Sequence, residues 1–258
     1  MPKFSAHLSF LFTELPFLDR FEAAAKAGFR AVEYLSPFEA PKSEIAARLE
    51  ANGLTQALFN MAQGDASAGE RGITAIPGRE AEFKRAVAAA IDYATALDCT
   101  RLHAMAGLVH HGADRGTFVA NLRIATQMCA PHGIDVLIEP INTRDIPGYF
   151  LNRTEDARAI IHEVAQPNIG LQFDLYHRQI VQGDVTMAIR EFGPLARHYQ
   201  LASPPDRGEP DVGELNYRHL FDEIDRSGYQ GWIGCEYRPR NGTLAGLGWA
   251  ERLGVRLG

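Results

Sequence analysis

Cysteine is scarce in this chain of 258 residues, and the three present, Cys99, Cys129 and Cys235, lie far apart. An odd number of cysteines at unrelated spacings is not typical of a disulfide framework, and the spacing does not match a zinc ligand set. The sequence therefore predicts three reduced cysteines in the core.

Long basic or apolar runs are also missing. The net charge is −6, with acids and bases interspersed, so nucleic acid is not an expected partner. No window reaches the roughly 20 apolar residues that span a bilayer, so no membrane partner is expected. The N-terminal stretch MPKFSAHLSFLF lacks the apolar length and the cleavage site of a signal peptide, which makes a cytoplasmic location the default prediction.

What the chain does have is an alternation of strand and helix patterns from end to end. A hydrophobic content of 46% against 22% charged residues is typical of a globular protein with a real core. Short apolar runs alternate eight times with segments of helical spacing. The predicted strands cover residues 4–8, 31–35, 54–61, 101–106, 136–141, 169–176, 196–202 and 231–237. The predicted helices cover residues 16–28, 43–52, 80–97, 117–132, 154–164, 185–192, 217–227 and 244–253.

Eight βα units are the count of a (β/α)8 barrel, and about 250 residues is a usual length for one. We therefore predict an α/β protein with a single TIM-barrel domain over residues 1–258. Long polar loops follow several strands, and such loops build the active site of a TIM barrel. A doubly wound sheet would need a glycine-rich turn after the first strand, but residues 9–15 contain no glycine. Glycines just past predicted helices favour short turns at the opposite end: Gly28, Gly53, Gly133 and Gly228.

Four oxygen-bearing side chains fall near the ends of successive strands: Glu139, Asp174, Gln200 and Glu236. Neighbouring parallel strands lie roughly 4.8 Å apart, so these side chains can converge on one ion. Three carboxylates at such distances would take up protons unless a cation neutralised them. An all-oxygen ligand set favours Mg²⁺ or Mn²⁺. The alternative is that the two glutamates pair with arginines at the rim and that Gln200 is a hydrogen-bonded core residue.

Two histidines and one further glutamate are candidates for the same site. His177 lies just beyond its predicted strand, which suits a hydrogen-bond donor to substrate. His103 alternates with its neighbours in a strand and is expected to point into the barrel. Since the chain lacks the spacing of a zinc site, we expect these histidines to contact substrate, not metal. Glu33, at the end of the second strand, either lines the same mouth or forms a structural ion pair.

Five long motifs resemble one known family. The resemblance runs along nearly the whole chain and is to hydroxypyruvate isomerase and the related 2-oxo-tetronate isomerases, within the xylose-isomerase-like barrel superfamily. The motifs are GDASAGERGITAIPGRE (64–80), LIEPINTRDIPGYFL (137–151), QFDLYH (172–177), RGEPDVGELNY (207–217) and GWIGCEYRP (231–239).

The resemblance implies an activity and a set of roles. It implies a metal-dependent aldose–ketose isomerase that interconverts hydroxypyruvate and tartronate semialdehyde, or a close 2-oxo-tetronate analogue, through an enediol. Glu139 and Glu236 would be the paired acid and base, and Asp174 and Gln200 would complete with them a site for Mg²⁺ or Mn²⁺. By similarity to related sugar epimerases, His177 and Arg207 would hold the oxygens of the substrate.

The substrate carboxylate has two candidate partners. Arg207 could hold it in a bidentate pair, and Arg71, in the loop 62–78, is the second candidate. For each arginine, a structural role as a clamp on its loop is equally open.

Three positions depart from the family pattern in regions where substrate shape could be read. Ser203-Pro204-Pro205 follows Ala202 where Asp-Asn-Pro is usual, Ala66 stands for a common tryptophan, and His7 stands for an asparagine. A keto-sugar 3-epimerase with the same metal and glutamate pair is therefore an alternative, as is a non-catalytic sugar-acid binding protein. A metal-dependent endonuclease is disfavoured, since it needs several histidines and a basic surface. Apolar surface on the outer helices would be compatible with a homo-oligomer.

Overall fold

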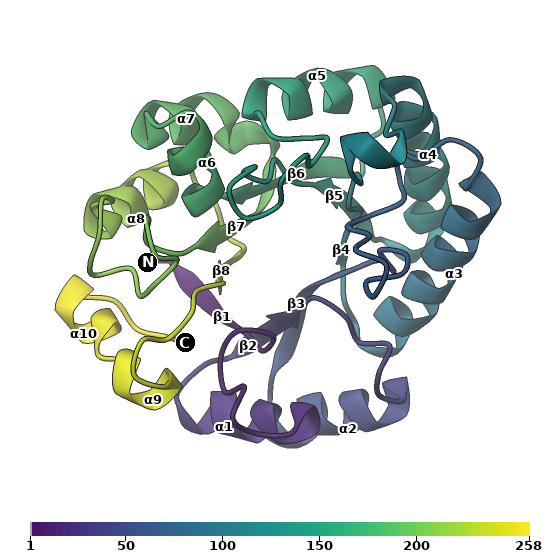
Figure 1. Ribbon diagram of the computed structural model, residues 1–258. Helices are drawn as coiled ribbons and strands as arrows, with labels where there is room; N and C mark the ends of the chain where they lie inside the picture. The colour runs from purple at the N-terminus through teal and green to yellow at the C-terminus, as the bar shows by residue number, and fades with distance from the viewer. Residues whose placement is uncertain (1) are drawn as a thin grey trace.

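A closed barrel of eight parallel strands lies at the centre of the computed structural model, which describes residues 2–258 (Figure 1). The strands pair in chain order, and β8 closes the barrel by pairing with β1. The predicted TIM barrel is confirmed. The strands are β1 Lys3–His7, β2 Ala31–Tyr34, β3 Thr55–Asn60, β4 Arg101–His103, β5 Asp135–Ile138, β6 Ile169–Asp174, β7 Ala196–Leu201 and β8 Trp232–Cys235.

The helices form a ring outside the barrel (Figure 1). The α-helices are α1 Arg20–Lys26, α2 Lys42–Asn52, α3 Glu80–Ala96, α4 Arg115–Cys129, α5 Thr154–Val164, α6 Leu175–Val181, α7 Val185–Phe192, α8 Tyr217–Arg226, α9 Thr243–Gly246 and α10 Trp249–Leu253. Short 3-10 turns are η1 Phe17–Asp19, η2 Val109–His111, η3 Ala130–His132 and η4 Gly193–Leu195.

Several predicted boundaries differ from the structure, and three of the differences have identifiable reasons. The sixth strand ends at Asp174, not Tyr176, because the Asp174 carboxylate accepts the Tyr176 N–H at 2.7 Å and caps an unpredicted helix, α6. The fourth strand ends at His103, after which the chain turns away to bridge with the loop 62–78. The last predicted helix is two short helices, because glycine destabilises a helix interior and Gly248 lies between them.

The predicted glycine turn after the second helix is confirmed. Gly53 follows α2 with a φ of 60°, the left-handed conformation that glycine adopts without steric cost. The next residue, Leu54, then donates its N–H to the Leu49 carbonyl at 3.0 Å and leads into β3.

Apolar side chains fill the space between the barrel and the helices. Phe4 of β1 is fully buried, and its ring lies edge-on to Phe221 of α8 at 5.2 Å and to Trp249 of α10 at 5.3 Å. The three cysteines are buried free thiols, as predicted. No helix within residues 2–258 has the length and apolar character needed to cross a membrane.

Candidate active site

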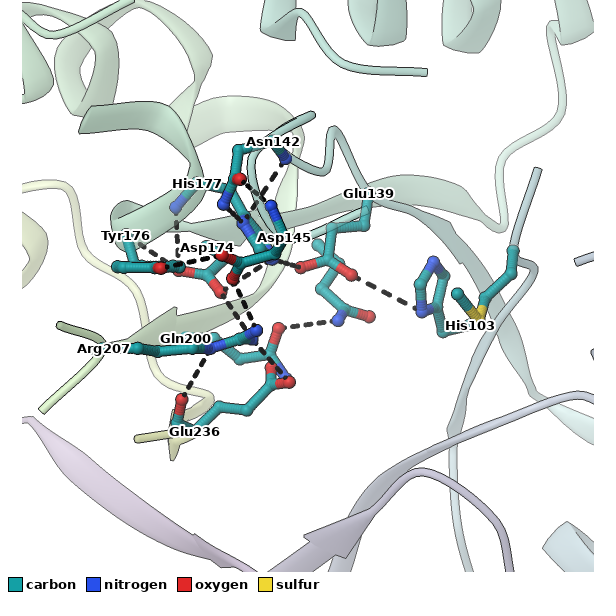
Figure 2. A network of polar contacts seen from close by, with 12 residues as sticks. His103, Glu139, Asn142, Asp145, Asp174, Tyr176, His177, Gln200, Arg207 and Glu236 are labelled. Carbon is teal, nitrogen blue, oxygen red and sulfur yellow. Dashed lines mark hydrogen bonds and ion pairs between the residues drawn. The ribbon is translucent and has the colours of Figure 1, made fainter. Parts of the chain in front are cut away.

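A cavity of about 340 Å³ lies at the carboxyl ends of the strands. That volume is at the small end of ligand pockets. Seven of the eight predicted site residues line it: Arg71, His103, Glu139, His177, Gln200, Arg207 and Glu236. The eighth, Asp174, is buried beside them, with Oδ2 3.5 Å from His177 Nε2. Figure 2 shows the labelled members of this group, which come from several strands, their loops and helix α6.

Glu139 follows β5 directly, at the point where the chain leaves the barrel. Its side chain is buried, and Oε1 has no hydrogen-bond partner within residues 2–258. Its other oxygen, Oε2, lies 3.7 Å from His103 Nδ1 (Figure 2). Burial, followed by the charges of Glu236 and Asp174, raises the pKa of Glu139 well above its usual value.

The two oxygens of Asp174 have different surroundings. Oδ1 accepts the N–H groups of Tyr176 and His177 at the start of α6, at 2.7 and 3.4 Å. Oδ2 is buried with no hydrogen-bond partner in the described chain. Burial raises the pKa of Asp174 to about 6, even though Arg207 opposes the shift. Glu139, Asp174 and His177 each offer one ligand atom, and these atoms lie within 4.8 Å of one another.

The hydrogen bonds of His177 determine which of its nitrogens carries the proton. Asn142 Oδ1 accepts the Asp145 N–H at 2.8 Å, so the Asn142 amide nitrogen is the donor to His177 Nδ1, at 2.6 Å. Burial lowers the pKa of His177 well below its usual value, so the ring is neutral. Its proton is therefore on Nε2, which faces Glu139 and Asp174 and is suited to donate to a ligand oxygen.

Glu236 and Arg207 are paired in this structure. Glu236 follows β8, and its Oε1 accepts from Arg207 Nη2 at 2.8 Å. The same guanidinium donates to Asp145 at 3.0 Å and lies over the rings of Phe10 and Tyr176, at 4.9 and 5.0 Å. Burial raises the pKa of Glu236 to about 8, although Arg207 acts in the opposite direction. One guanidinium is thus shared among several carboxylates of the protein (Figure 2).

Gln200 reaches the cavity from β7 with both ends of its amide engaged. Oε1 accepts from Gln172 at 2.6 Å, and Nε2 donates to Glu33 Oε1 at 2.9 Å.

Glu33 Oε2 accepts from Ser5 at 2.6 Å and pairs with His198 Nε2 at 2.8 Å. Because β2 and β7 are not neighbours, these bonds cross the barrel interior. Burial opposes the charge on Glu33, but His198, His7 and Ser5 lower the pKa to about 2. Of its two predicted roles, the structure shows the ion pair.

Arg71 and His103 complete the predicted set. Arg71 Nη1 donates to the Glu70 carbonyl at 2.7 Å, and within residues 2–258 the Arg71 guanidinium has no ion pair. His103 Nδ1 lies 3.2 Å from Asn60 Oδ1, while its Nε2 is buried without a partner in the described chain. Burial lowers the pKa of His103 to about 3, so the ring is neutral.

Sequence reasoning missed part of the site and misplaced one residue. Gln172 and Asn142 contact the predicted residues, and both lie inside motifs already noted, two positions before Asp174 and three after Glu139. Ser203 does not line the cavity as expected, because its hydroxyl donates to the Val212 carbonyl and closes a loop. His7 and Ala66, the other departures from the family pattern, do line the cavity.

The model of the xylose isomerase-like TIM barrel family matches residues 21–253. The chain belongs to this family. A 2-oxo-tetronate isomerase from Cupriavidus necator is 56% identical over 97% of this chain and 98% of its own length. The hydroxypyruvate isomerase of Escherichia coli is 45% identical over 97% of this chain and 99% of its own.

A solved structure from Brucella melitensis, described as an AP endonuclease of family 2, is also similar. It is 50% identical, with a TM-score of 0.95 over 98% of this chain and 99% of its own. Together with the two isomerases, the comparisons confirm the family resemblance and the prediction that the chain is an enzyme of the isomerase class.

Proposed function

We propose that this enzyme is a divalent-metal-dependent isomerase of small sugar acids, which interconverts hydroxypyruvate and tartronate semialdehyde or a close 2-oxo-tetronate analogue. One observation carries the proposal. Two buried glutamates, which follow β5 and β8, line a small cavity together with Arg71, whose guanidinium has no ion pair within residues 2–258, and the buried carboxylate of Asp174 lies beside them. The names of the close relatives support the same substrate class.

The donor atoms fit a divalent cation. Glu139 Oε1 and Asp174 Oδ2 are buried acceptors without partners in the described chain, and the carboxyl groups of Asp174 and Glu236 lie 3.9 and 2.8 Å from the single guanidinium of Arg207. A cation among them would lower their pKa values and satisfy both oxygens. Glu139, Asp174, Gln200 and Glu236 would hold Mg²⁺ or Mn²⁺. When bound, the ion would act as a Lewis acid on the carbonyl and hydroxyl oxygens of the substrate.

The two glutamates are suited to move the proton between adjacent carbons. One carboxylate removes the proton from the hydroxyl-bearing carbon, which leaves an enediolate, and the other carboxyl returns a proton to the neighbouring carbon. The proton of the substrate hydroxyl moves to the former carbonyl oxygen, so the two forms are isomers.

His177 and Arg71 would hold the substrate's oxygens. The proton on His177 Nε2 can be donated to an oxygen on the reacting carbons. Arg207 already serves Glu236 and Asp145, so we assign the substrate carboxylate to Arg71 and the positioning of Glu236 to Arg207. His103 lies beyond Glu139 and would contribute the lone pair of Nε2 to a substrate hydroxyl.

A substrate screen tests the proposal. The purified enzyme is incubated with hydroxypyruvate, 2-oxo-tetronates and ketohexoses, each with Mg²⁺, Mn²⁺ or EDTA, and the products are followed by NMR in deuterated water. We expect metal-dependent isomerisation of the acids with deuterium incorporated at the carbon that receives the proton. Turnover of ketohexoses alone would instead identify a 3-epimerase.

The assignment of Arg71 has its own test. Replacing Arg71 with glutamine should raise KM for the acids at least tenfold, since a charge-assisted bidentate contact is lost. The matched control is Arg85→Gln, because Arg85 is an exposed arginine of α3. An unchanged KM in Arg71→Gln, with a raised KM in Arg207→Gln, would reverse the two assignments.

DNA cleavage is disfavoured despite the description of the Brucella relative. Nucleic-acid binding depends on a basic surface, whereas this chain carries a net charge of −6. We infer a cytoplasmic enzyme whose partner is its small-molecule substrate, alone or as a homo-oligomer. An assay on abasic-site DNA, with zinc and with Mn²⁺, should give no cleavage.

A further inference from the structure

A chain of three side chains runs from the barrel interior to the cavity. Glu33 of β2 accepts from Gln200 of β7, and Gln200 in turn accepts from Gln172 of β6. Gln172 is only 2% exposed and lines the cavity, yet its Oε1 has no hydrogen-bond partner in the described chain. A buried acceptor without a partner is costly, so such an atom beside a ligand cavity requires an explanation.

Glu33 fixes the orientation of both amide groups in this hydrogen-bonded series. Both oxygens of Glu33 face donors: Oε1 faces Gln200, and Oε2 faces Ser5 and His198. If the Gln200 amide were reversed, its oxygen would face the Glu33 carboxylate, and two acceptors would be in contact. Gln200 therefore presents its own oxygen to Gln172, whose nitrogen must point back. The other end of the Gln172 amide is therefore its oxygen, Oε1, which is an acceptor and does not face Gln200.

The backbone is shaped around the same residues. The strand register shifts between Val32 and Glu33 where β2 meets β3, and between Leu171 and Gln172 where β6 meets β7. Such shifts re-aim side chains and are common beside active sites. On β8, a Cβ at Gly234 would lie 2.1 Å from Glu33 Oε1, so glycine is needed there to leave room for the carboxylate.

We propose that Gln172 Oε1 accepts a hydrogen bond from a hydroxyl group of the substrate, and that Glu33 acts through Gln200 as the positioning residue that keeps this oxygen toward the cavity. The inference rests on the proposed function, since it assumes a hydroxylated acid as the ligand. It adds a substrate contact on β6, one layer deeper than Asp174. Selection between hydroxylated acids and their deoxy analogues would depend on this contact.

A series of unreactive acids tests the contact without turnover. Propanoate, lactate and glycerate carry no, one and two hydroxyl groups, and none can isomerise because none has an aldehyde or ketone carbonyl. Their affinities for the Mn²⁺-loaded enzyme are measured by calorimetry. We call the gain in affinity from propanoate to lactate, or from lactate to glycerate, a hydroxyl step. In the wild type we expect at least one hydroxyl step to be tenfold or more. In Gln172→Met, which removes the acceptor at nearly constant volume, that hydroxyl step should fall to less than threefold, while the affinity for propanoate should stay the same.

Two further variants separate this role from a structural one. Gln56→Met is the matched control, because Gln56 is a buried glutamine of β3 that does not line the cavity. It should leave every hydroxyl step intact. Glu33→Gln should weaken the same step as Gln172→Met, and the double variant should lose no more than Gln172→Met alone. If Gln172→Met does not fold, the loss of the step in Glu33→Gln carries the test.

The outcomes distinguish the two proposals. If none of the acids binds the wild type and hydroxypyruvate is not turned over, the proposed function fails. If the acids bind but Gln172→Met keeps every hydroxyl step, the proposed function stands and the role of Gln172 is overturned. If Gln172→Met loses the step but Glu33→Gln keeps it, the contact stands and the positioning role of Glu33 is overturned.

Discussion

The inner and outer faces of the same barrel strands carry different side chains with different roles. On β1, Phe4 packs outward against Phe221 and Trp249, whereas its neighbour Ser5 donates inward to Glu33. The interior of a TIM barrel is usually filled by branched apolar side chains. Here it holds Glu33 with its hydrogen-bonding partners, so the outer face supplies the apolar burial and the inner face supplies the chemistry.

The inner face also carries buried polar atoms that have no hydrogen-bond partner in the described chain. Among buried polar atoms without a partner in the described chain, several belong to cavity-lining residues: His7 Nδ1, His103 Nε2, Glu139 Oε1 and Gln172 Oε1. Each such group lowers stability, because burial removes its water without replacing the hydrogen bond. These four atoms are available to a ligand in the cavity, and the comparison predicts that inner substitutions change activity while outer ones change stability.

The largest effect is expected from the inner face. Replacing Glu139 with glutamine should lower kcat by about 10²–10⁴-fold, since an acid or base is removed from the proton transfer. Stability should be unchanged or higher, because the carboxylate is buried with an oxygen that has no partner in the described chain. Turnover assays and urea unfolding measure both quantities.

Two variants control this result. Glu163→Gln removes an exposed carboxylate that pairs with Arg115, and it should leave turnover at the wild-type level. Wild-type turnover in the double variant Glu139→Gln/Glu236→Gln would contradict the proton-transfer assignment.

On the outer face, Phe4→Ala should reduce the free energy of unfolding by about 3–5 kcal/mol, because a fully buried ring is lost and a cavity remains. Urea unfolding measures the loss, and kcat per folded molecule should stay unchanged. Leu244→Ala, at a side chain 68% exposed, is the control and should be close to neutral. A large fall in kcat in folded Phe4→Ala would break the division between the two faces.

Binding of Mn²⁺ should stabilise the folded protein. At a Mn²⁺ concentration 100 times its Kd, the wild type should gain about 2.7 kcal/mol by mass action, seen as a rise in Tm that EDTA reverses. Asp174→Asn should lose this rise, because it removes a negative charge from the proposed ligand set, at a side chain whose Oδ2 has no hydrogen-bond partner in the described chain. An equal rise in both proteins would place the ion elsewhere.

The smallest effect is expected at a helix end that does not line the cavity. Asp114 caps α4 by accepting the Thr117 N–H at 2.7 Å, so Asp114→Ala should lower stability by about 1 kcal/mol. Asp114→Asn keeps a cap acceptor and should recover most of the loss. Turnover should be unchanged in both variants, and a parallel loss of kcat would show that the outer ring is coupled to the site.

Local patterns in the sequence determined the barrel and much of the candidate site. Periodicity and turn residues depend on neighbours a few positions apart, which is why the eight units and the carboxylates that follow β5 and β8 were predictable, although these strands end at Ile138 and Cys235, before the predicted ends at 141 and 237. The same local rule failed at Asp174, where a strand pattern continues to Tyr176 but the carboxylate caps a helix instead. That choice depends on a side-chain hydrogen bond, which periodicity does not record.

Only the tertiary structure decided which side chains meet. Glu33 and His198 are 165 positions apart in the sequence, yet they lie 2.8 Å apart across the barrel. The pairing of Arg207 with Glu236, the proton on His177 Nε2 and the free oxygen of Gln172 likewise follow from contacts between distant segments. Sequence patterns specify each strand and the end that carries its polar residue, whereas closure of the barrel sets the distances between those ends, and the chemistry depends on the distances.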